Sequence, residues 1–323
     1  MYNTLSKRIQ QMETILKGTH RLASQKREEG KESTACLYRA ASNHLRQYFR
    51  GRDLPLHKLG AAHVEGFAAY LTHTLGLAPN TTTCYLAAIR AMYNRLLEQS
   101  LRHGRHRDAF RGEHPFRGLR SRHEPTPKRA IRPASINKLS ALPPATGEEL
   151  RRAADFFLFS YLGCGIPFID LARLRKDNLR DGVLRYRRQK TGKPVAIRVT
   201  PGMRAILDRY HSSQGEYLFP ILAEGHTYNS YKRDLRKYNK ALRELGRQLN
   251  IAHLTSYVAR HSWATEAYRR HTPMAVISQA LGHSSEQTTR FYLDQLDISD
   301  LARANRLIVG DLDRMMGETL IRH

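Results

Sequence analysis

The spacing of apolar residues predicts helices over most of the first hundred positions. Apolar side chains recur every three or four residues in 34–49 and again in 61–75, as on the buried face of an amphipathic helix. A third helix of the same kind is expected to begin at Asn80, a residue type that caps helix N-termini. Residues 1–30 are polar and charged and predict a helix or an arm. No strand pattern occurs before residue 180.

The second half of the chain predicts further helices and one hairpin. Residues 147–163 predict a helix whose second half is almost wholly apolar, as suits the centre of a core. Alternating residues in 183–188 and 194–199 flank a Gln-Lys-Thr-Gly-Lys turn, which predicts a β-hairpin with Lys190 near its tip. A long basic helix is expected at 228–249, followed by shorter ones. The fold class is therefore mainly α, with a small antiparallel sheet in an α+β second domain.

A stretch rich in Gly, Pro and Arg without periodicity separates these two parts. It predicts an N-terminal helix or arm at 1–30, a helical domain at 31–112, a basic linker at 113–133 and a second domain at 134–323. At 323 residues the chain is long enough for two domains that each bury a core.

Composition excludes several classes of protein. A hydrophobic content of 41% excludes a disordered polymer, and no window approaches the ~18 uncharged apolar residues of a membrane span. The N-terminus lacks the apolar run of a secretory signal, and three cysteines predict a reducing compartment. The histidines are scattered, with no Cys/His cluster at ligand spacing, so we expect no metal and no cofactor. These features predict a soluble, cytoplasmic protein.

The charge balance indicates a polyanionic partner. Lys and Arg total 54 against 29 Asp and Glu, a net charge of 54 − 29 = +25 that is spread along the chain. Such a surface binds phosphates with salt-sensitive, largely sequence-independent affinity. Charge alone does not choose between DNA and RNA, so an RNA-associated protein stays open. The basic linker is expected to follow a phosphate backbone, the alternative being a plain solvated linker.

Three short stretches of the second domain carry candidate chemistry: 255–265, 281–285 and 288–292. Taken singly, each is typical of ordinary surface, turn or core residues. In order and spacing they resemble the tyrosine recombinases, the phage integrase family, whose boxes read His-x-x-Arg-His-x-x-Ala-Thr, Leu-Gly-His-x-Ser and a Tyr nine residues after that His. The matching residues here are Arg260-His261 with Ala264-Thr265, Leu281-Gly282-His283-Ser284, and Tyr292. The sequence of the linker and the stretch Tyr-Val-Ala-Arg-His look most like the corresponding segments of integrases from Bacteroides-type mobile elements.

The resemblance implies a site-specific DNA recombinase that works without metal. Tyr292 would attack the scissile phosphate and form a 3′-phosphotyrosine, leaving a free 5′-hydroxyl. Arg260 would hold the non-bridging oxygens with its planar fork of donors. His283 would hydrogen-bond the phosphate or assist proton transfer from Tyr292. Lys190 matches the general acid that protonates the leaving oxygen.

Two positions depart from the family pattern. Tyr257 stands where the first box has His, although a phenol can still donate a hydrogen bond to phosphate. Pro167 stands where a first catalytic Arg is expected, and Cys164 occupies the alternative place before the glycine. Losing one phosphate donor costs about 3–4 kcal/mol in the transition state. Arg173 and Arg175 are the nearest substitutes, more simply explained as facing solvent or backbone phosphate.

The resemblance also implies how the chain works with its partners. Two lobes would clamp double-stranded DNA, and a tetramer would assemble on two DNA sites. Accessory DNA-bending proteins are further candidate partners, and no membrane is involved. The protein is expected to associate with the nucleoid. A C-terminal helix at 300–316 would pack on a neighbouring protomer or close its own domain, and 1–30 would be an arm for accessory sites or an undocked helix. The alternatives are a DNA-binding family member with weak or absent catalysis and a type IB topoisomerase-like enzyme. Expected DNA contacts are Arg117, Arg120, Lys128, Arg129, Arg188, Lys193 and His261.

Overall fold

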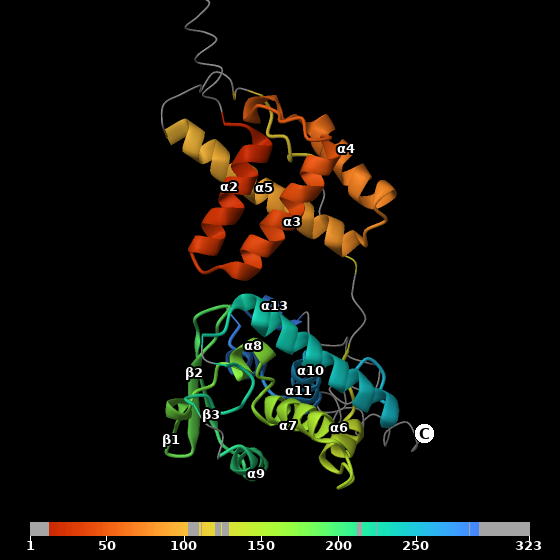
Figure 1. Cartoon of the computed structure of the whole chain (residues 1–323), viewed down its shortest axis with the longest axis vertical. Helices are drawn as coiled ribbons and strands as arrows, with labels where there is room; N and C mark the ends of the chain where they lie inside the picture. Colours follow the sequence, from red (N-terminus) through yellow and green to blue (C-terminus); the bar gives the residue numbers. More distant parts are fainter. Residues whose placement is uncertain are drawn as a thin grey trace, which may run out of the picture. The chain divides into compact units, whose positions relative to one another are not determined.

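A computed structural model of the chain forms two compact units, Met1–Thr126 and Pro127–His323 (Figure 1). The break between them falls inside the stretch predicted as the basic linker. The structure describes residues 13–102, 110, 112–119, 124, 129–211, 215–223, 225–283 and 285–290. Outside these ranges lie Tyr292, Arg120, Lys128 and the predicted C-terminal helix.

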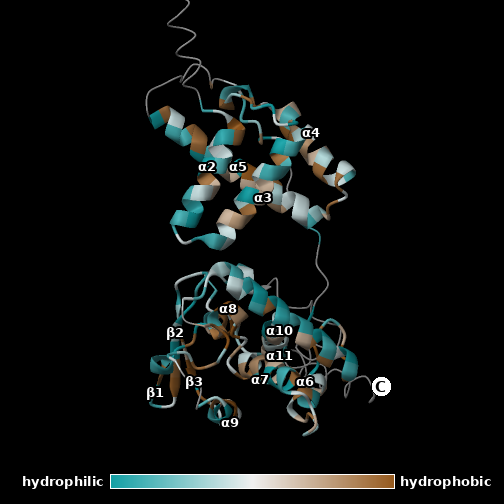
Figure 2. Cartoon of the chain, in the orientation of Figure 1, coloured by the Kyte–Doolittle hydropathy of each residue, from teal (hydrophilic) through white to brown (hydrophobic). Residues whose placement is uncertain are grey.

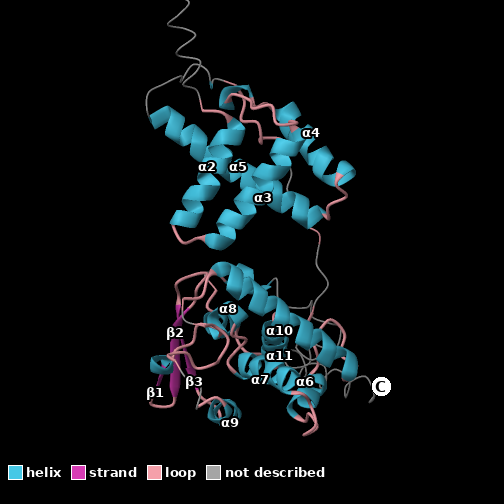
Figure 3. Cartoon of the chain, viewed as in Figure 1, coloured by secondary structure: helices cyan, strands magenta, loops and turns pink. Residues whose placement is uncertain are grey.

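In its described part the first unit is built of helices joined by loops (Figure 3). Its apolar residues meet in one core, which includes Phe67, Ile89 and Met92. The predicted helical character of this region is therefore confirmed. Its elements are α2 (Ile15–Glu28), α3 (Glu32–Tyr48), a 3₁₀ turn (Leu56–Lys58), α4 (Ala61–Ala69), a π-helical turn (Tyr70–Thr74) and α5 (Pro79–Arg102).

Helix α2 is docked on the first unit. Ile15 and Leu22 lie in the core, and α2 packs along α3. Asp53 caps the start of α2 from a neighbouring loop, because its carboxylate accepts hydrogen bonds from the backbone N–H of Leu16 at 2.9 Å and of Lys17 at 3.2 Å. The described part of the predicted arm is therefore a helix of this unit.

Helix α5 begins two residues earlier than a cap at Asn80 predicts. Pro79 occupies the first turn, where its missing N–H costs nothing, so Asn80 lies inside the helix and not at its cap. The Asn80 side chain instead exchanges two hydrogen bonds with the backbone of Glu124, at 2.9 and 3.0 Å. The expected N-cap at Asn80 is therefore wrong, because its amide ties down a distant segment.

Part of the predicted linker belongs to the first core. Phe116 is 2% exposed and packs on Tyr93 with ring centroids 5.8 Å apart. His114 lies edge-on to the same tyrosine, and its Nε2 is 2.8 Å from Oδ1 of Asn94. An aromatic anchor therefore holds residues 112–119 on α5, which a reading from Gly, Pro and Arg content alone misses.

The second unit surrounds a central helix with further helices and one sheet (Figure 1). The sheet is antiparallel in the order β1-β2-β3, and Leu184 pairs with Ile197 in its register. The predicted hairpin and small sheet are confirmed, while the two-residue β1 was too short to leave a pattern. The elements are α6 (Pro133–Ser140), α7 (Glu148–Leu162), α8 (Phe168–Leu171), a 3₁₀ turn (Lys176–Asn178), β1 (Leu179–Arg180), β2 (Val183–Arg187), β3 (Pro194–Arg198), α9 (Pro201–Arg209), α10 (Tyr228–Gln248), α11 (Val258–Arg269), α12 (Met274–Leu281) and α13 (Glu286–Arg290).

The core of this unit forms around α7. Phe157 and Phe159 are fully buried, and Phe159 meets Phe219 at a ring distance of 4.8 Å. Helix α10 covers this core with Leu242 and Leu245 inward, and its visible face is mostly hydrophilic in Figure 2. The predicted apolar helix at 147–163 is therefore confirmed as the centre of the second unit.

Candidate active site

Arg260 is buried at the centre of the predicted site. It lies in the first turn of α11 and is 2% exposed. Its Nη1 donates to the carbonyl oxygen of Gly165 at 2.9 Å, and its Nη2 donates to that of Leu281 at 2.5 Å. Gly165 has φ +74°, and a Cβ there would stand 2.7 Å from the Arg260 Cα. A glycine is therefore needed for the chain before α8 to approach this arginine.

His283 contacts the Arg260 guanidinium directly. Gly282 ends α12 in the left-handed region at φ +63°, and the turn brings the His283 ring beside α11. Its Nε2 lies 2.9 Å from Nη2 of Arg260. Burial, followed by the positive charges of Arg260, Arg188 and Lys190, lowers the pKa of His283 to about 4. The imidazole is therefore neutral near pH 7.

Arg188 lies deeper than a contact to the DNA backbone would require. Its side chain is 7% exposed, and its Nε lies 2.6 Å from Oδ2 of Asp170. Its Nη1 donates to the carbonyl oxygen of Leu281, the same oxygen that accepts from Arg260. Arg188, which the sequence predicts only as a DNA contact, is therefore a buried member of the cluster, with its guanidinium against the carboxylate of Asp170.

The tip of the hairpin is fixed on both sides of Lys190. The backbone N–H of Gln189 donates to Oδ1 of Asp170 at 2.8 Å, and Oγ1 of Thr191 donates to the carbonyl oxygen of Gly282 at 3.1 Å. The Lys190 side chain itself is exposed. Its charge nevertheless contributes to the lowered pKa of His283. The hairpin thus presents a solvated lysine beside a buried cluster.

Neither Pro167 nor Cys164, the two residues at the place of the missing first arginine, carries a positive charge. Pro167 precedes α8 and is buried, and burial raises the pKa of the Cys164 thiol to about 11, which keeps it protonated. Arg173 lies over the Tyr231 ring at 5.6 Å from its centroid, facing α10. Arg175 is exposed and its Nη1 pairs with Glu216 at 2.9 Å. The contacts of these two arginines therefore lead toward α10 and the segment around residue 217.

The other predicted site residues lie nearer the surface. Tyr257 is 41% exposed, immediately before α11, and its ring meets that of His261 edge-on at 5.1 Å. Arg129 and Lys193 are exposed. Arg117 is exposed in the first unit and its Nη1 pairs with Glu113 at 2.6 Å. The structure therefore brings Arg260, His283 and the end of the hairpin together, with Tyr257 one turn before Arg260.

Two members of the cluster were not expected from the sequence. Asp170 is 2% exposed and orients Arg188, and burial raises the pKa of its carboxyl. Thr289 is fully buried, and its Oγ1 lies 2.9 Å from Nδ1 of His283. Thr289 lies in the stretch 288–292 and six residues from its partner, whereas Asp170 follows Pro167 closely and pairs with a residue of the hairpin.

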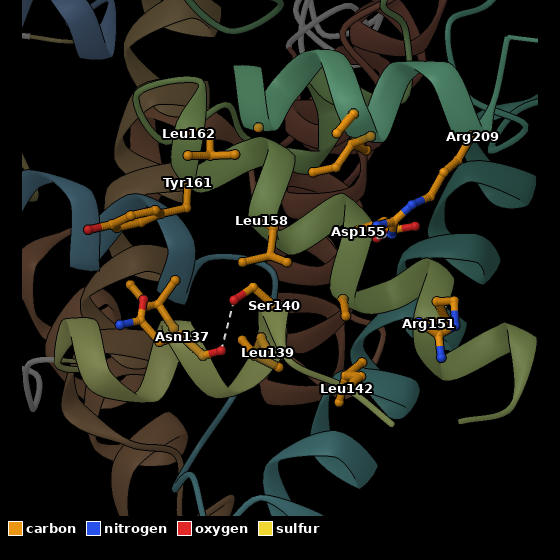
Figure 4. Close-up of a pocket in the computed structure, with 15 residues that line it drawn as sticks. Asn137, Leu139, Ser140, Leu142, Arg151, Asp155, Leu158, Tyr161, Leu162 and Arg209 are labelled. Atoms are coloured by element: carbon orange, nitrogen blue, oxygen red, sulfur yellow. Dashed lines mark hydrogen bonds and ion pairs between the residues drawn. The ribbon is translucent and has the colours of Figure 1, made fainter. Parts of the chain in front are cut away.

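One cavity of the second unit lies apart from these residues. A pocket of about 360 Å³ lies among α6, α7 and α9 (Figure 4). At one end, Arg209 donates to the carboxylate of Asp155 at 2.5 Å and the Tyr210 hydroxyl donates to it at 3.0 Å. The predicted site residues are not among the side chains that line it. The candidate chemistry is therefore separate from this pocket.

Two features are absent from the described ranges. No group of three His, Cys, Asp or Glu side chains there is placed to hold a metal ion. No helix in those same ranges is long and apolar enough to cross a membrane.

The low pKa of His283 predicts how its replacement changes stability with pH. Because the folded-state pKa of about 4 lies below the unfolded value of 6.5, the unfolded chain binds a proton between these values that the folded chain does not. The stabilising contribution of His283 is thus complete above pH 6.5 and is lost as pH falls toward 4. The variant His283→Gln should lower the melting temperature more at pH 7.5 than at pH 5. An equal decrease at both values would contradict the lowered pKa.

Comparison with known proteins assigns both units to one family. The model of the Phage integrase family matches residues 132–297, and that of the Phage integrase SAM-like domain matches residues 4–100. The tyrosine recombinase XerA of Thermococcus kodakarensis is 26% identical over 59% of this chain and 66% of its own length. A tyrosine recombinase of Pseudothermotoga lettingae is 23% identical over 79% of this chain and 85% of its own.

Solved structures show the same fold. The Tn1549 transposon integrase in complex with transposon right end DNA has a TM-score of 0.62 at 14% identity, over 92% of this chain and all of that one. A lambda integrase dimer bound to a COC′ core site has a TM-score of 0.62 at 16% identity, over 92% of this chain and 84% of that one. The fold expected from the sequence is confirmed. With both of its units matched, the chain belongs to the phage integrase family, the tyrosine recombinases that cut and rejoin DNA strands.

Proposed function

We propose that the cluster around Arg260 binds the scissile phosphate of a DNA duplex in a site-specific recombinase. One observation carries this proposal: two buried guanidinium groups, of Arg188 and Arg260, donate to the same carbonyl oxygen of Leu281 beside a neutral His283. Groups fixed in this way need little reorganisation when charge develops on a phosphorane. Such an arrangement suits phosphoryl transfer without a metal ion.

In this proposal Arg188 supplies the guanidinium that Pro167 and Cys164 do not. Arginine presents its donors as a rigid fork that matches phosphate oxygens, and two such forks can address both non-bridging oxygens. Asp170 orients Arg188 through its Nε and leaves the terminal nitrogens directed at the cluster. The alternative, a DNA-binding protein without catalysis, was suggested by the missing arginine. Because Arg188 supplies a second buried guanidinium, that reason no longer applies.

The proposed reaction keeps the energy of the cleaved bond in the protein. The phenolic oxygen of Tyr292 forms a bond to phosphorus while the bond from phosphorus to the 5′-oxygen breaks. Lys190 gives a proton to that 5′-oxygen, which leaves as a hydroxyl. The 5′-hydroxyl of another strand then attacks the 3′-phosphotyrosine and restores the phosphodiester and the phenol. No nucleotide cofactor is consumed.

Several finer expectations belong to the same proposal. Double-stranded DNA is the partner, in keeping with the DNA complexes of the structural relatives. Exposed Arg117, Arg129 and Lys193 and half-buried His261 are the described candidates for backbone contacts. A tetramer on two sites, accessory DNA-bending proteins, nucleoid association, membership of the Bacteroides-type subgroup and the domain limits 31–112, 113–133 and 134–323 stay predictions.

Covalent capture tests the proposed function. The full chain is incubated with a library of nicked duplexes of random sequence, and complexes that survive denaturing detergent are recovered and sequenced. We expect an adduct with the unaltered chain and none with Tyr292→Phe, which lacks only the attacking oxygen. Both proteins should bind duplex with the same affinity at low salt. Failure of the unaltered chain to form an adduct, or an adduct with Tyr292→Phe, would contradict the proposal.

A further inference from the structure

The loop that joins β2 to β3 is closed by its own backbone. The N–H of Arg188 donates to the carbonyl oxygen of Lys193 at 2.9 Å, and the N–H of Gly192 donates to that of Arg188 at 2.8 Å. Because two hydrogen bonds close so short a loop, residues 188–193 move as one body. The place of Lys190 within this tip therefore depends on what the tip contacts.

The tip is docked on the turn that ends α12. In that turn the carbonyl oxygen of Leu281 accepts from Nη1 of Arg188. The next carbonyl oxygen, of Gly282, accepts from Oγ1 of Thr191 at 3.1 Å. A Cβ at residue 282 would stand 2.8 Å from Cγ of Arg188 and 3.2 Å from Cγ2 of Val195. The hairpin therefore lies directly against the backbone of the turn, with no room for a side chain between them.

Lys190 lies between two of the anchors. On one side, the N–H of Gln189 donates to Oδ1 of Asp170 at 2.8 Å. On the other side, the hydroxyl of Thr191 makes its bond to Gly282. The first anchor uses a backbone donor, which any residue except proline supplies at position 189. The second depends on the hydroxyl of Thr191, so a substitution there can loosen the tip while the other contacts remain.

We propose that Thr191 is a positioning residue that docks the hairpin tip in the free protein, so that Lys190 already lies beside the cluster before DNA binds. The alternative is a tip that is free in solution and is placed only by its contacts with DNA. The inference rests on the proposed function for what Lys190 does, whereas the docking is a property of the free chain.

A docked tip favours the step in which the 5′-oxygen leaves. The N–H bond at Nζ of Lys190 breaks as an O–H bond forms at the 5′-oxygen, and the proton returns to Nζ in rejoining. This transfer requires Nζ within hydrogen-bond reach of that oxygen in the transition state. A methyl group in place of Oγ1 of Thr191 would leave the Gly282 carbonyl without this donor and would stand farther from it. The tip would then be both looser and displaced.

The first test reads docking in the full chain without any DNA. Hydrogen exchange of the Gln189 amide, followed by ¹H–¹⁵N NMR, reports opening of the tip, because this N–H is bonded to Asp170 only while the tip is docked. We expect slow exchange in the unaltered chain and in Thr191→Ser. Exchange should be about three- to tenfold faster in Thr191→Val, the effect of one hydrogen bond. An unprotected amide in the unaltered chain, or equal protection in Thr191→Val, would overturn the inference.

The second test separates the placing of the acid from general damage to the site. In one duplex, sulfur replaces the 5′-oxygen of the scissile phosphate, and a thiolate leaves without needing a proton. Thr191→Val should slow covalent capture about threefold or more on the ordinary duplex and stay within about twofold on the sulfur duplex. Lys190→Met should show the same pattern with a larger loss, about 100-fold or more on the ordinary duplex. Thr191→Ser, which keeps the hydroxyl, should follow the unaltered chain on both.

The outcomes distinguish this inference from the proposed function. Equal slowing of Thr191→Val on both duplexes, or no slowing on the ordinary one, would overturn the role of Thr191. Equal slowing of Lys190→Met on both would overturn Lys190 as the donor, and the inference with it. If the unaltered chain forms no adduct on either duplex, the proposed function fails, while docking still stands on the exchange measurement. Melting temperatures show whether each variant is folded.

Discussion

Replacing Arg188 with methionine should lower the rate of covalent capture about 100- to 1,000-fold, the effect of losing one fixed donor to a developing oxyanion. Duplex binding should change little, because Arg188 is buried and a duplex is held mainly by many exposed cations. The matched control is Arg173→Met, which removes an arginine that faces Tyr231 and should leave the rate within about threefold, as for a residue outside the reacting groups. Rates are measured on one duplex from the library.

A second variant separates catalysis from folding. Removing Arg188 alone leaves the buried carboxylate of Asp170 without its ion-pair partner, which costs about 3–5 kcal/mol of stability. The double variant Arg188→Met/Asp170→Asn removes both charges, and its amide oxygen can still accept from the backbone of Gln189. It should regain most of the melting temperature and remain as slow as Arg188→Met. A stable double variant that cleaves at the normal rate would contradict the role of Arg188.

Replacing Gly165 with alanine should slow covalent capture about 100-fold or more, although no reacting group is removed. The new Cβ would stand 2.7 Å from the Arg260 Cα, so the backbone of α11 or the loop before α8 must shift. Displacing a positioning group by ~1 Å costs about two orders of magnitude in rate. The left-handed φ of +74° adds about 1–2 kcal/mol of strain for alanine.

Gly182→Ala provides the matched control for Gly165. Gly182 has φ +70°, but a Cβ there meets nothing within 4 Å. Gly182→Ala should therefore lose stability through backbone strain, as Gly165→Ala does. Its cleavage rate should stay within about twofold of that of the unaltered chain. If both variants slow capture equally, the close approach of residue 165 to Arg260 has no part in catalysis.

The arrangement of helices and the hairpin could be predicted because burial repeats along the chain with the period of each element. The two-residue β1 and the anchoring of Phe116 could not, since neither forms a periodic pattern. The expected N-cap at Asn80 was wrong for a related reason. An asparagine near the start of a helix predicts a cap from the local sequence, but this side-chain amide donates to the backbone of Glu124.

The hairpin did contain a signal for Arg188. Leu184 and Tyr186 lie on the inner face of β2, and side chains on one face of a strand follow every second residue. Arg188 continues that parity past the end of the strand, so its inward direction could have been inferred. Its partners could not, because they are a backbone carbonyl, of Leu281, and a carboxylate on α8, and no local pattern links these distant segments.

Thr289 was hidden for another reason. It lies in the stretch 288–292, where attention falls on Tyr292, and a threonine hydroxyl is chemically unremarkable until its partner is known. Only the turn at Gly282, which brings His283 back beside α13, gives the hydroxyl its partner. Site residues with their own chemistry could be found from the sequence, whereas those that orient them required the fold.

Cleavage of a methylphosphonate tests the central claim most directly. In this duplex one non-bridging oxygen of the scissile phosphate is a methyl group, so the phosphorane carries one negative charge less. We expect Arg188 and Arg260 to share the neutralisation of that charge. The fold-decrease in cleavage rate caused by losing Arg188 should then be at least about tenfold smaller on the methylphosphonate than on the phosphate. The account predicts this reduced penalty for Arg188→Met. An equal penalty on both duplexes would show that Arg188 does not act on the phosphate and would contradict the account.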